Sequence, residues 1–513
     1  MKTENRNLVL FYIESFFISL LSAYFIWLQT SKYGIGLSPD STHYLRWSEA
    51  ISQEGFAFIF NNKSATFPPF YPLLLSFMSA PFHLDSLVAA RCFNIILVFF
   101  FSFFSLILCR KLTNNILILL ISGLLIAASK PINHVFSYAW SEPLFLFLLL
   151  LITFSIEKTY YKNLILCGFL SALAILTRYA GVAIVPAVCL HIFMEKRELQ
   201  EKIKKSICYA SIPTLTYIAY LVRNYYFTNT LMGEERVKSI TGLISNTDRA
   251  LSTVVLWFSG QHFQYFFMAA FSLLILGAFI WNYKKDLVLH IINSPKIISF
   301  SVCFFLIYSA FIIISSTTTA YDLINDRLMS PIFSSVLLML LLFILFCIHI
   351  ISTAKKDKIL AYIMFLICLT CTIFSVANTW NNDVFFRKNN GAGGYASVFW
   401  QENKLFEYLR KNKLNPSEKI YTNDIYSFFL VDKNIIPSRI PWKKYRNSSK
   451  FTGITLENFA IKNPDFENCL LVYFSNIDQL GMFTLTELQT ICEMETVIKT
   501  TGGSVFRVGK CKK

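Results

Sequence analysis

Residues 86–109 read SLVAARCFNIILVFFFSFFSLILC and contain a single charged side chain, Arg91. About 20 apolar residues in a row are enough for a helix to cross a bilayer, so this stretch predicts a membrane-spanning helix. The whole chain of 513 residues is 55% hydrophobic and 15% charged, and its mean hydropathy is +0.50. Soluble domains carry about 25% charged residues. The composition therefore predicts a polytopic membrane protein.

Further apolar stretches flank this one along the chain. No small-residue cleavage site follows the first, Leu8–Leu28, so we interpret it as a retained helix rather than a signal peptide. The short stretches at 163–177 and 180–194 fit either two spans or one re-entrant pair. We predict about eleven transmembrane helices, at 8–28, 86–109, 113–129, 141–156, 163–177, 180–194, 206–222, 262–282, 298–316, 328–351 and 359–377.

The formal net charge of +16 indicates how the chain is oriented in the membrane. Lys and Arg cluster in short segments between apolar stretches, which is typical of membrane topology, and we predict no nucleic-acid partner. These segments alternate with loops that are longer or poorer in Lys and Arg. The positive-inside rule places the N-terminus in the cytoplasm, and an odd number of spans places the C-terminus outside. We expect an integral protein of the inner or plasma membrane.

The tail after the last apolar stretch has the composition of a soluble domain. It begins with the Gly-rich segment 389–394, which we interpret as a linker. The patterns that follow predict a helix at 403–413, an apolar strand at 469–474 and a hairpin around Gly502-Gly503, and a short apolar run lies at 420–422. We divide the chain into a transmembrane domain, residues 1–380, with a first outward loop at 29–85, and a small extracytoplasmic α/β domain, residues 381–513.

The cysteines suggest packing rather than metal binding. Most of the twelve lie inside apolar stretches, and no CxxC pair or Cys/His metal spacing occurs. Cys469, Cys492 and Cys511 lie in the tail, which the predicted topology places in an oxidising compartment. Two of these three could form a disulfide there, and one would remain.

The first outward loop contains the segment SPDSTHY, residues 38–44. Ser38 fits a helix N-cap and Pro39 fits the first helical position, so Asp40 would lie in the first turn, just outside the membrane. Asp40 either complements the helix dipole or acts as a general base that faces a cavity. The helix N-terminus would keep this carboxylate ionised, as a base must be.

Other charged residues stand at the outward ends of apolar stretches. Glu142 directly precedes a span, where a carboxylate is costly unless it is solvated, caps the helix or faces a polar cavity. Arg178 joins two short stretches, and Arg223 begins a sizeable outward loop. Each arginine could contact lipid headgroups or hold a phosphate through two parallel hydrogen bonds.

Asp326-Arg327 precedes the tenth predicted span. An outward Arg opposes the positive-inside trend, so Arg327 needs a partner, either a local carboxylate or a lipid phosphate. Carboxylates and arginines at one membrane face are what a reaction between a membrane-bound phosphoester and a hydroxyl or amine requires. The sequence leaves open whether these residues meet in space.

These motifs resemble those of the GT-C membrane glycosyltransferases in their order along the chain and in the side of the membrane on which they are predicted to lie. The resemblance is to glycosyltransferase family 39 and its bacterial relatives: the protein O-mannosyltransferases, the aminoarabinose transferase of lipid A and the galacturonosyltransferases of lipopolysaccharide core. It covers roughly residues 8–380 and rests on Pro39-Asp40-Ser41 with Tyr44, Pro68-Pro69-Phe70-Tyr71-Pro72, Ser141-Glu142-Pro143, Thr177-Arg178-Tyr179, Arg223-Asn224, and Asp326-Arg327 with Pro331.

The resemblance implies a GT-C-like fold and an inverting sugar transfer at the outer face of the membrane. The donor would be a sugar on a polyprenyl phosphate, and the acceptor an envelope lipid, glycan or protein. Asp40 would be the catalytic base, and Arg327, with Arg178 or Arg223, would neutralise the leaving phosphate. Glu142 would orient the acceptor or the sugar, or help to bind a divalent cation. The predicted substrate-binding residues are His43, Tyr44, Glu142, Arg178, Tyr179, Arg223, Asn224, Asp326 and Arg327.

One departure from the family leaves the acceptor and the metal open. Several members have two adjacent acidic residues in the first loop, whereas here Ser41 follows Asp40. The class of acceptor and the role of a metal ion therefore stay open, as does the identity of the sugar.

Two other functions compete with the enzyme. A transporter or flippase of lipid-linked sugars would share the charged outer edge, but it needs ionisable residues within its spans, and few occur here. A membrane scaffold whose tail binds a partner would not need Asp40, Glu142 and Arg327 to converge. Convergence of these three side chains would therefore favour the enzyme over the scaffold.

Overall fold

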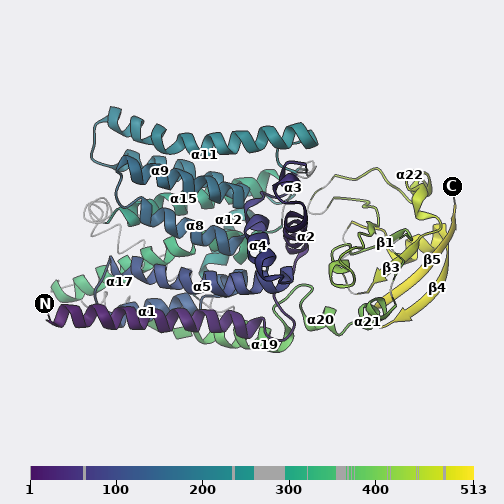
Figure 1. Ribbon diagram of the computed structural model, residues 1–513, viewed down its shortest axis with the longest axis horizontal. Coiled ribbons are helices and arrows are strands. Elements are labelled where there is room, and N and C mark those ends of the chain that lie inside the picture. Colours follow the sequence, from purple (N-terminus) through teal and green to yellow (C-terminus); the bar gives the residue numbers. More distant parts are fainter. Residues whose placement is uncertain are drawn as a thin grey trace.

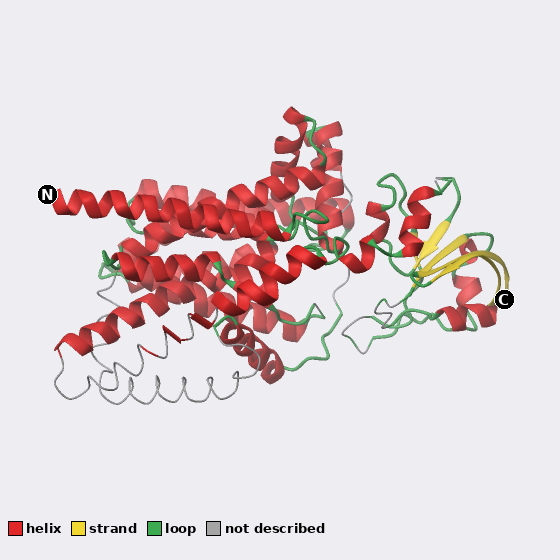
Figure 2. Ribbon diagram, turned by 90° about the horizontal axis from the view of Figure 1, so that it is seen from below, coloured by secondary structure: helices red, strands yellow, loops and turns green. Residues whose placement is uncertain are grey.

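The computed structural model of the chain describes residues 2–61, 65–233, 237–258, 295–320, 322–353 and 376–412, a few positions between 366 and 374, and most of 414–512. Figure 1 shows a bundle of long helices with a smaller part beside one of its ends, and the N-terminus lies at the opposite end. Seen from below in Figure 2, the strands occupy only the smaller part. The chain is thus mostly helical with a small sheet, as the sequence predicts.

The first half of the helical part runs from the N-terminus to residue 194. Its helices are α1 Lys2–Gln29, α2 Pro39–Glu54, α3 Phe56–Asn61, α4 Phe70–Ser79, η1 Ala80–Phe82, α5 Ser86–Arg110, α6 Ile116–Ala127, α7 Lys130–Phe136, α8 Glu142–Ser155, α9 Tyr161–Thr177, η2 Tyr179–Ala183 and α10 Ile184–Met194.

The second half of the helical part ends where the chain enters the smaller part. Its described helices are α11 Leu199–Thr228, α12 Leu243–Leu256, α15 Lys296–Thr318, α16 Asp326–Met329, η3 Ser330–Ile332, α17 Phe333–Thr353, the π-helical turn η4 Thr379–Phe385, and α19 Phe386–Asn390.

Membrane-spanning length is reached by fewer helices than the sequence predicts. Among the described residues, four helices are long and apolar enough to cross a bilayer, and the bent pair α6–α7 makes a fifth if it is one span. Apolar helices such as α8, with 14 residues, are shorter than the ~20 residues that a bilayer requires. The predicted span 262–282 and most of 359–377 lie outside the described residues. The number eleven therefore stays a prediction.

The first outward loop places α2 at the end of the bundle, between the long helices and the smaller part (Figure 1). As predicted, Ser38 caps this helix: its side chain accepts a hydrogen bond from the N–H of Ser41, whose hydroxyl in turn accepts from the N–H of Ser38. Pro39 occupies the first turn because it has no N–H to leave unpaired. Asp40 follows it, with its carboxylate at the positive end of the helix dipole.

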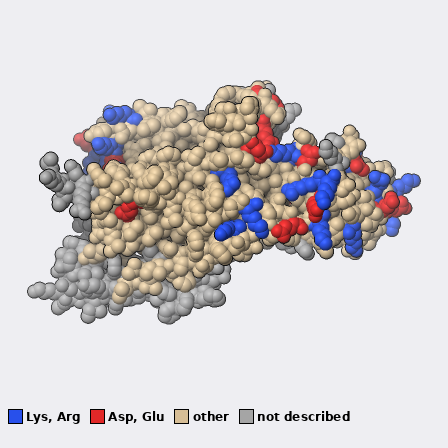
Figure 3. Space-filling model, turned by 60° about the horizontal axis from the view of Figure 1, so that its bottom comes forward, with Lys and Arg blue, Asp and Glu red and all other residues tan. Residues whose placement is uncertain are grey.

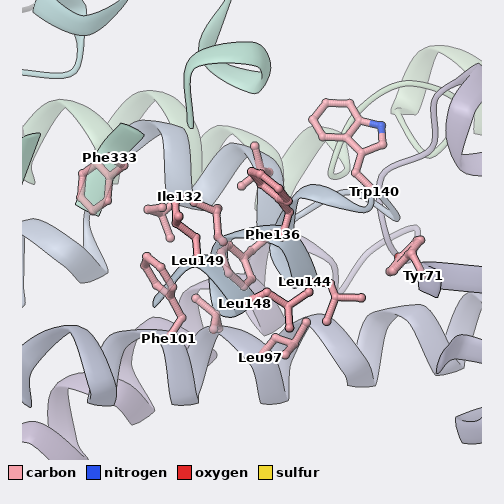
Figure 4. Close-up of a cluster of buried hydrophobic side chains, with 14 of the residues drawn as sticks. Tyr71, Leu97, Phe101, Ile132, Phe136, Trp140, Leu144, Leu148, Leu149 and Phe333 are labelled. Carbon is pink, nitrogen blue, oxygen red and sulfur yellow. The ribbon is translucent and has the colours of Figure 1, made fainter. Parts of the chain in front are cut away.

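The core of the bundle is built from aromatic and branched aliphatic side chains of several helices. Figure 4 shows Leu97 and Phe101 of α5 close to Phe136 of α7 and Leu148 of α8. The rings of Phe101 and Phe136 are 5.7 Å apart, and both side chains are fully buried. Trp140 stands at the edge of this cluster, where the chain leaves α7 and enters α8 (Figure 4). The packed core thus supports the segment that leads into Glu142.

The smaller part folds around a mixed sheet of five strands in the order β2-β1-β3-β5-β4. β1 pairs in parallel with β2 and β3, whereas β3, β5 and β4 pair antiparallel. Every residue of β3 is buried. The elements of the smaller part are α20 Val398–Gln401, α21 Lys404–Lys411, β1 Ile420–Thr422, η5 Ser427–Leu430, β2 Ser438–Arg439, α22 Phe459–Lys462, η6 Pro464–Phe466, β3 Leu470–Phe474, α23 Leu485–Ile491, β4 Cys492–Thr500 and β5 Gly503–Cys511.

The predicted strand and hairpin of the tail are present, and the short apolar run is a strand as well. The apolar runs at 420–422 and 469–474 form β1 and β3, and the turn at Gly502 joins β4 to β5. Cys492 and Cys511 form a disulfide between the ends of this hairpin, and Cys469 is the buried free third cysteine. A disulfide between two of the three tail cysteines is therefore confirmed, and the structure identifies the pair.

Candidate functional site

Four charged side chains from four separate elements meet at the end of the bundle next to α2. Asp40 lies in the first turn of α2, Glu142 begins α8, Arg178 lies between α9 and η2, and Arg327 lies in α16. The carboxylate of Glu142 binds both guanidinium groups through its Oε1. The Nη2 of Arg327 lies 2.6 Å from the Oδ2 of Asp40. We call Asp40, Glu142, Arg178 and Arg327 the charged cluster.

Burial differs within the charged cluster. The side chain of Glu142 is inaccessible, those of Arg327 and Arg178 are 12% and 14% exposed, and that of Asp40 is 31% exposed. Two carboxylates and two guanidinium groups balance in formal charge, which buried ions require because an unpaired charge costs several kcal/mol. Asp40 is therefore the member that an incoming molecule can reach most easily.

Polar and aromatic neighbours fix the members of the charged cluster. The ring of Trp140 lies 4.4 Å from the guanidinium of Arg327, and its Nε1 donates to the Oγ of Ser38 at 2.7 Å. The Oγ of Ser141 lies 3.3 Å from Arg178 Nη1 and 3.1 Å from the hydroxyl of Tyr44.

Tyr44 contributes a neutral hydroxyl to this site. Burial raises the pKa of its phenol well above the ordinary value, and the nearby charge of Asp40 acts in the same direction. Tyr44 therefore remains able both to donate and to accept a hydrogen bond at neutral pH.

Asp326 points away from the charged cluster although it is adjacent to Arg327. Its carboxylate lies 3.2 Å from the Nζ of Lys130 and 3.9 Å from the Nδ1 of His134, and it accepts a hydrogen bond of 2.9 Å from Trp257. These contacts attach the short helix α16 to α7 and α12. Sequence reasoning did not single out Lys130, His134 or Trp257. The only signal was that Lys130 and His134 lie in the outward loop that leads to Glu142.

Tyr179, Arg223 and Asn224 form a second group, which binds backbone carbonyls, and we call it the anchoring set. Arg223 Nη2 donates to the carbonyl of Ile59 at 2.7 Å, and the hydroxyl of Tyr179 donates to that of Ala65 at 2.7 Å. The fully buried Asn224 donates to Tyr179 and to the carbonyl of Leu231, both at 3.0 Å. The anchoring set therefore holds the first outward loop and the loop after α11.

His43 lies at the boundary with the smaller part. Its ring is 5.7 Å from that of Phe67 and 5.5 Å from that of Tyr426. The structure thus brings together Asp40, Tyr44, Glu142, Arg178 and Arg327 of the predicted site residues. The other five predicted residues bind the separate partners described above: His43, Tyr179, Arg223, Asn224 and Asp326.

Each carboxylate of the charged cluster contacts guanidinium groups through one oxygen, Oδ2 in Asp40 and Oε1 in Glu142. The Oε2 of Glu142 is buried and has no hydrogen-bond partner among the described residues. In the part of the chain that the structure describes, no group of three or more His, Cys, Asp or Glu side chains is arranged to hold a metal ion. The chemistry derived below therefore uses only side chains.

On the face drawn in Figure 3, charged side chains gather over the smaller part and near its junction with the bundle, while the middle of the bundle surface is largely uncharged. An uncharged belt of this kind is what contact with lipid tails requires.

Sequence comparison gives no relative, whereas structural comparison does. No family model and no curated protein matches the sequence. The fold is similar to crystal structures of ArnT from Cupriavidus metallidurans. The apo state has a TM-score of 0.57 and 11% identity over 96% of this chain and 97% of that one. The undecaprenyl phosphate complex has a TM-score of 0.55 and 11% identity over 95% and 97%.

A weaker similarity is to the oligosaccharyltransferase AglB of Archaeoglobus fulgidus, in complex with an inhibitory peptide and a dolichol-phosphate. Its TM-score is 0.49, with 11% identity over 97% of this chain and 74% of that one. ArnT is a glycosyltransferase of the GT-C fold. At 11% identity the likeness to ArnT concerns the fold, and it extends over nearly the whole of both chains. This chain therefore has the GT-C fold of membrane glycosyltransferases.

Proposed function

We propose that this protein is an integral membrane glycosyltransferase that moves a sugar from a polyprenyl-phosphate donor to an envelope acceptor at the outer face of the membrane. The observation that carries the proposal is the charged cluster, in which the partly exposed carboxylate of Asp40 contacts Arg327, one of two largely buried arginines that share Glu142. The donor class is supported by the similar structure of ArnT, which is bound to undecaprenyl phosphate. The predicted topology supports the outer face.

The proposed reaction inverts the configuration of the sugar. An acceptor hydroxyl or amine attacks the anomeric carbon from the side opposite the phosphate. The bond between this carbon and the phosphate oxygen breaks, and its electron pair leaves with the polyprenyl phosphate. Asp40 accepts the proton that the acceptor loses, which requires an ionised carboxylate within hydrogen-bond reach.

The arginines would act on the leaving group. The donor is a phosphodiester with one negative charge, and the departing polyprenyl phosphate gains a second. Positive groups fixed near this oxygen stabilise the transition state more than the ground state. Arg327 and Arg178 are held in place because both bind the buried carboxylate of Glu142, and we propose that they face the phosphate of the donor.

The contact between Arg327 and Asp40 suggests how the base becomes available. Arg327 Nη2 and Asp40 Oδ2 are 2.6 Å apart. A phosphate that binds Arg327 would compete with Asp40 for the same guanidinium, because both are oxygen anions. Donor binding would thereby free a carboxylate oxygen to accept the proton.

The positions of the charged cluster favour an enzyme over a transporter. Glu142 and Asp40 begin their helices, Arg178 follows the end of α9, and Arg327 lies at the start of α16. The cluster therefore occupies one end of the bundle. A transporter of lipid-linked sugars would need polar groups along a path through the bilayer.

The substitution Asp40→Asn tests the proposal. Transfer from a panel of radiolabelled polyprenyl-phosphate sugars is measured with purified full-length wild type and variant. We expect the variant to fold, to bind donor and to lose at least about 100-fold in kcat, because Asn cannot accept the proton. The matched control is Asp465→Asn, which removes an exposed carboxylate paired with Lys419 in the smaller part.

Two results would contradict the proposal. Near-wild-type turnover by Asp40→Asn would remove this residue as the base. Wild type that binds donor without transferring or hydrolysing it, and that moves the donor across liposome membranes, would identify a flippase instead.

A further inference from the structure

The backbone just before α2 lies between two other segments and is hydrogen-bonded to both. On one side, Gly36 N–H donates to the carbonyl of Ser137 at 2.8 Å, and Ala139 N–H donates to the carbonyl of Gly36 at 2.9 Å. On the other side, Leu37 N–H donates to Gly393 at 3.2 Å, and Tyr395 N–H donates to Leu37 at 2.9 Å. We call these three segments, 36–37, 137–139 and 393–395, the clasp.

The clasp stands directly before both carboxylates of the charged cluster. Asp40 is three residues after Leu37, and Glu142 is three residues after Ala139. The third segment, 393–395, belongs to the Gly-rich stretch that the sequence suggested as a linker. Its backbone is hydrogen-bonded to Leu37, so this end of the predicted linker is held against the segment before α2.

The glycines of the third segment are required by close contact. Gly394 has φ +57°, and a Cβ there would lie 1.7 Å from the carbonyl oxygen of Leu37. Gly393 has φ +123°, and a Cβ there would lie 2.1 Å from the hydroxyl of Tyr138. A side chain at Gly394 must therefore push the segment before α2 out of place, and one at Gly393 must displace the ring of Tyr138.

A guanidinium connects the two outer segments of the clasp. Arg387 donates to the Oγ of Ser137 at 3.2 Å and also to the carbonyl of Ala392. It lies 5.6 Å from the ring of Tyr138, which stacks on Trp140 with 4.1 Å between ring centres. Trp140 in turn covers Arg327. The contacts thus run without a break from the Gly-rich stretch to the charged cluster.

The remainder of α2 is also attached to the smaller part. The Nζ of Lys433 lies 2.6 Å from the carboxylates of both Glu49 in α2 and Asp85 at the start of α5. Burial lowers the pKa of Lys433, but Asp85 and Glu49 outweigh it and raise this pKa above the ordinary lysine value, so the bridge is charged at neutral pH. Arg46 donates to the carbonyl of Ile435 at 3.4 Å.

We propose that the smaller part of the fold, with the Gly-rich stretch that leads into it, positions α2 and, through the clasp, holds Asp40 against Arg327. Gly394 and Arg387 are positioning residues in this arrangement, since neither touches the charged cluster itself. The inference rests on the proposed function of Asp40. The inference gives the smaller part a role in the geometry of the reaction that is distinct from binding a substrate.

The substitution Gly394→Ala tests the clasp. Its matched control is Gly453→Ala, because Gly453 also has a positive φ, +76°, but a Cβ there would meet only the Nζ of Lys462 at 3.7 Å. Both full-length variants are assayed with the radiolabelled polyprenyl-phosphate sugar that gives the highest wild-type turnover. We expect kcat of Gly394→Ala to fall about 100-fold, since displacement of a reacting group by ~1 Å has this effect.

The division between kcat and KM separates positioning from general damage. We expect the KM for donor to stay within about twofold of wild type in Gly394→Ala, and both constants to be unchanged in Gly453→Ala. Wild-type kcat in Gly394→Ala would overturn the inference. So would an equal loss in both variants, or a raised KM with unchanged kcat.

Arg387 provides a second test if Gly394→Ala does not fold. Arg387→Gln removes the connection between Ser137 and Ala392 without adding a clash, and it should lower kcat while Arg387→Lys recovers part of the loss. Wild-type kcat in Arg387→Gln would overturn the inference. The proposed function is tested by a different result. Turnover by Asp40→Asn would show that Asp40 is not the catalytic base. If Asp40→Asn is inactive but the clasp variants are fully active, only the positioning role of the clasp is contradicted.

Discussion

The charged cluster and the anchoring set lie at the same end of the helical bundle but bind different partners. In the charged cluster, side chains from α2, α8, the α9–η2 junction and α16 bind one another. In the anchoring set, three side chains bind carbonyl oxygens of nearby loops. Both groups consist of residues that the sequence placed in a substrate site.

The difference concerns which bonds can be exchanged for a ligand. Asn224 has two amide hydrogens, and Tyr179 and the carbonyl of Leu231 occupy both. Replacing either contact with a ligand would take a donor away from a partly buried carbonyl or hydroxyl, and an unsatisfied buried polar group costs about 1–3 kcal/mol. Arg327, in contrast, binds a partly exposed carboxylate that water or substrate can replace. We infer that the charged cluster performs chemistry and that the anchoring set maintains the loops around it.

The substitution with the largest expected effect is Glu142→Gln. It removes the one carboxylate that Arg178 and Arg327 share and leaves two buried like charges without it. We expect loss of turnover together with a lower free energy of unfolding, by about 3–5 kcal/mol for a broken buried pair. Activity and thermal unfolding of the purified protein are measured together.

Glu195→Gln is the matched control for this substitution. Glu195 is 8% exposed and pairs with Arg197 and Lys296, in contacts that involve none of the residues of the charged cluster. It should lower the unfolding temperature but preserve the turnover of the folded fraction. Full turnover by folded Glu142→Gln would mean that the charged cluster is structural, and the comparison with the anchoring set would fail.

The next largest effect is expected at Arg327. Its guanidinium binds Glu142 through Nε and Asp40 through Nη2, a geometry that a single ammonium group cannot reproduce. We expect Arg327→Ala to lower kcat/KM for the donor by about 10²–10³-fold, and Arg327→Lys to lose less because it keeps the charge. Initial rates are measured over a range of donor concentrations.

Arg197 offers a control with the same geometry outside the site. It binds Glu195 through Nε at 2.7 Å and Glu201 through Nη1 at 2.5 Å. Its Ala and Lys variants should both retain donor use. Equal losses in Arg327→Ala and Arg327→Lys would indicate that the site needs the planar guanidinium group of arginine, with its several N–H donors, rather than the positive charge alone.

Local patterns in the sequence were sufficient for the helix that carries Asp40. Ser38, Pro39 and Ser41 define its start through capping, which depends on residues only three positions apart. The apolar runs that became β1 and β3 were equally local. Short-range rules identify such elements because neighbouring residues determine them.

Features that depend on packing between distant segments could not be predicted. Arg178 and Arg223 looked equivalent in the sequence, but only Arg178 contacts Glu142, because α9 lies beside α8 in the bundle. The Gly-rich stretch suggested a linker because glycine favours flexibility, whereas Gly394 is needed for close approach to Leu37. The choice of Cys492 and Cys511 over Cys469 likewise depends on the register of β4 and β5.

The smallest effect is expected for Asn224→Ala. It leaves the carbonyl of Leu231 and the hydroxyl of Tyr179 without a buried donor, which should lower the free energy of unfolding by about 1–3 kcal/mol and leave kcat unchanged. The control is Asn246→Ala, where an equally buried amide donates to Thr317 at 3.0 Å. If Asn224→Ala instead weakens donor binding at an unchanged unfolding temperature, the anchoring set contacts the substrate. The site would then extend from Asp40 to α11, and the distinction between side-chain and backbone partners would no longer separate chemistry from support.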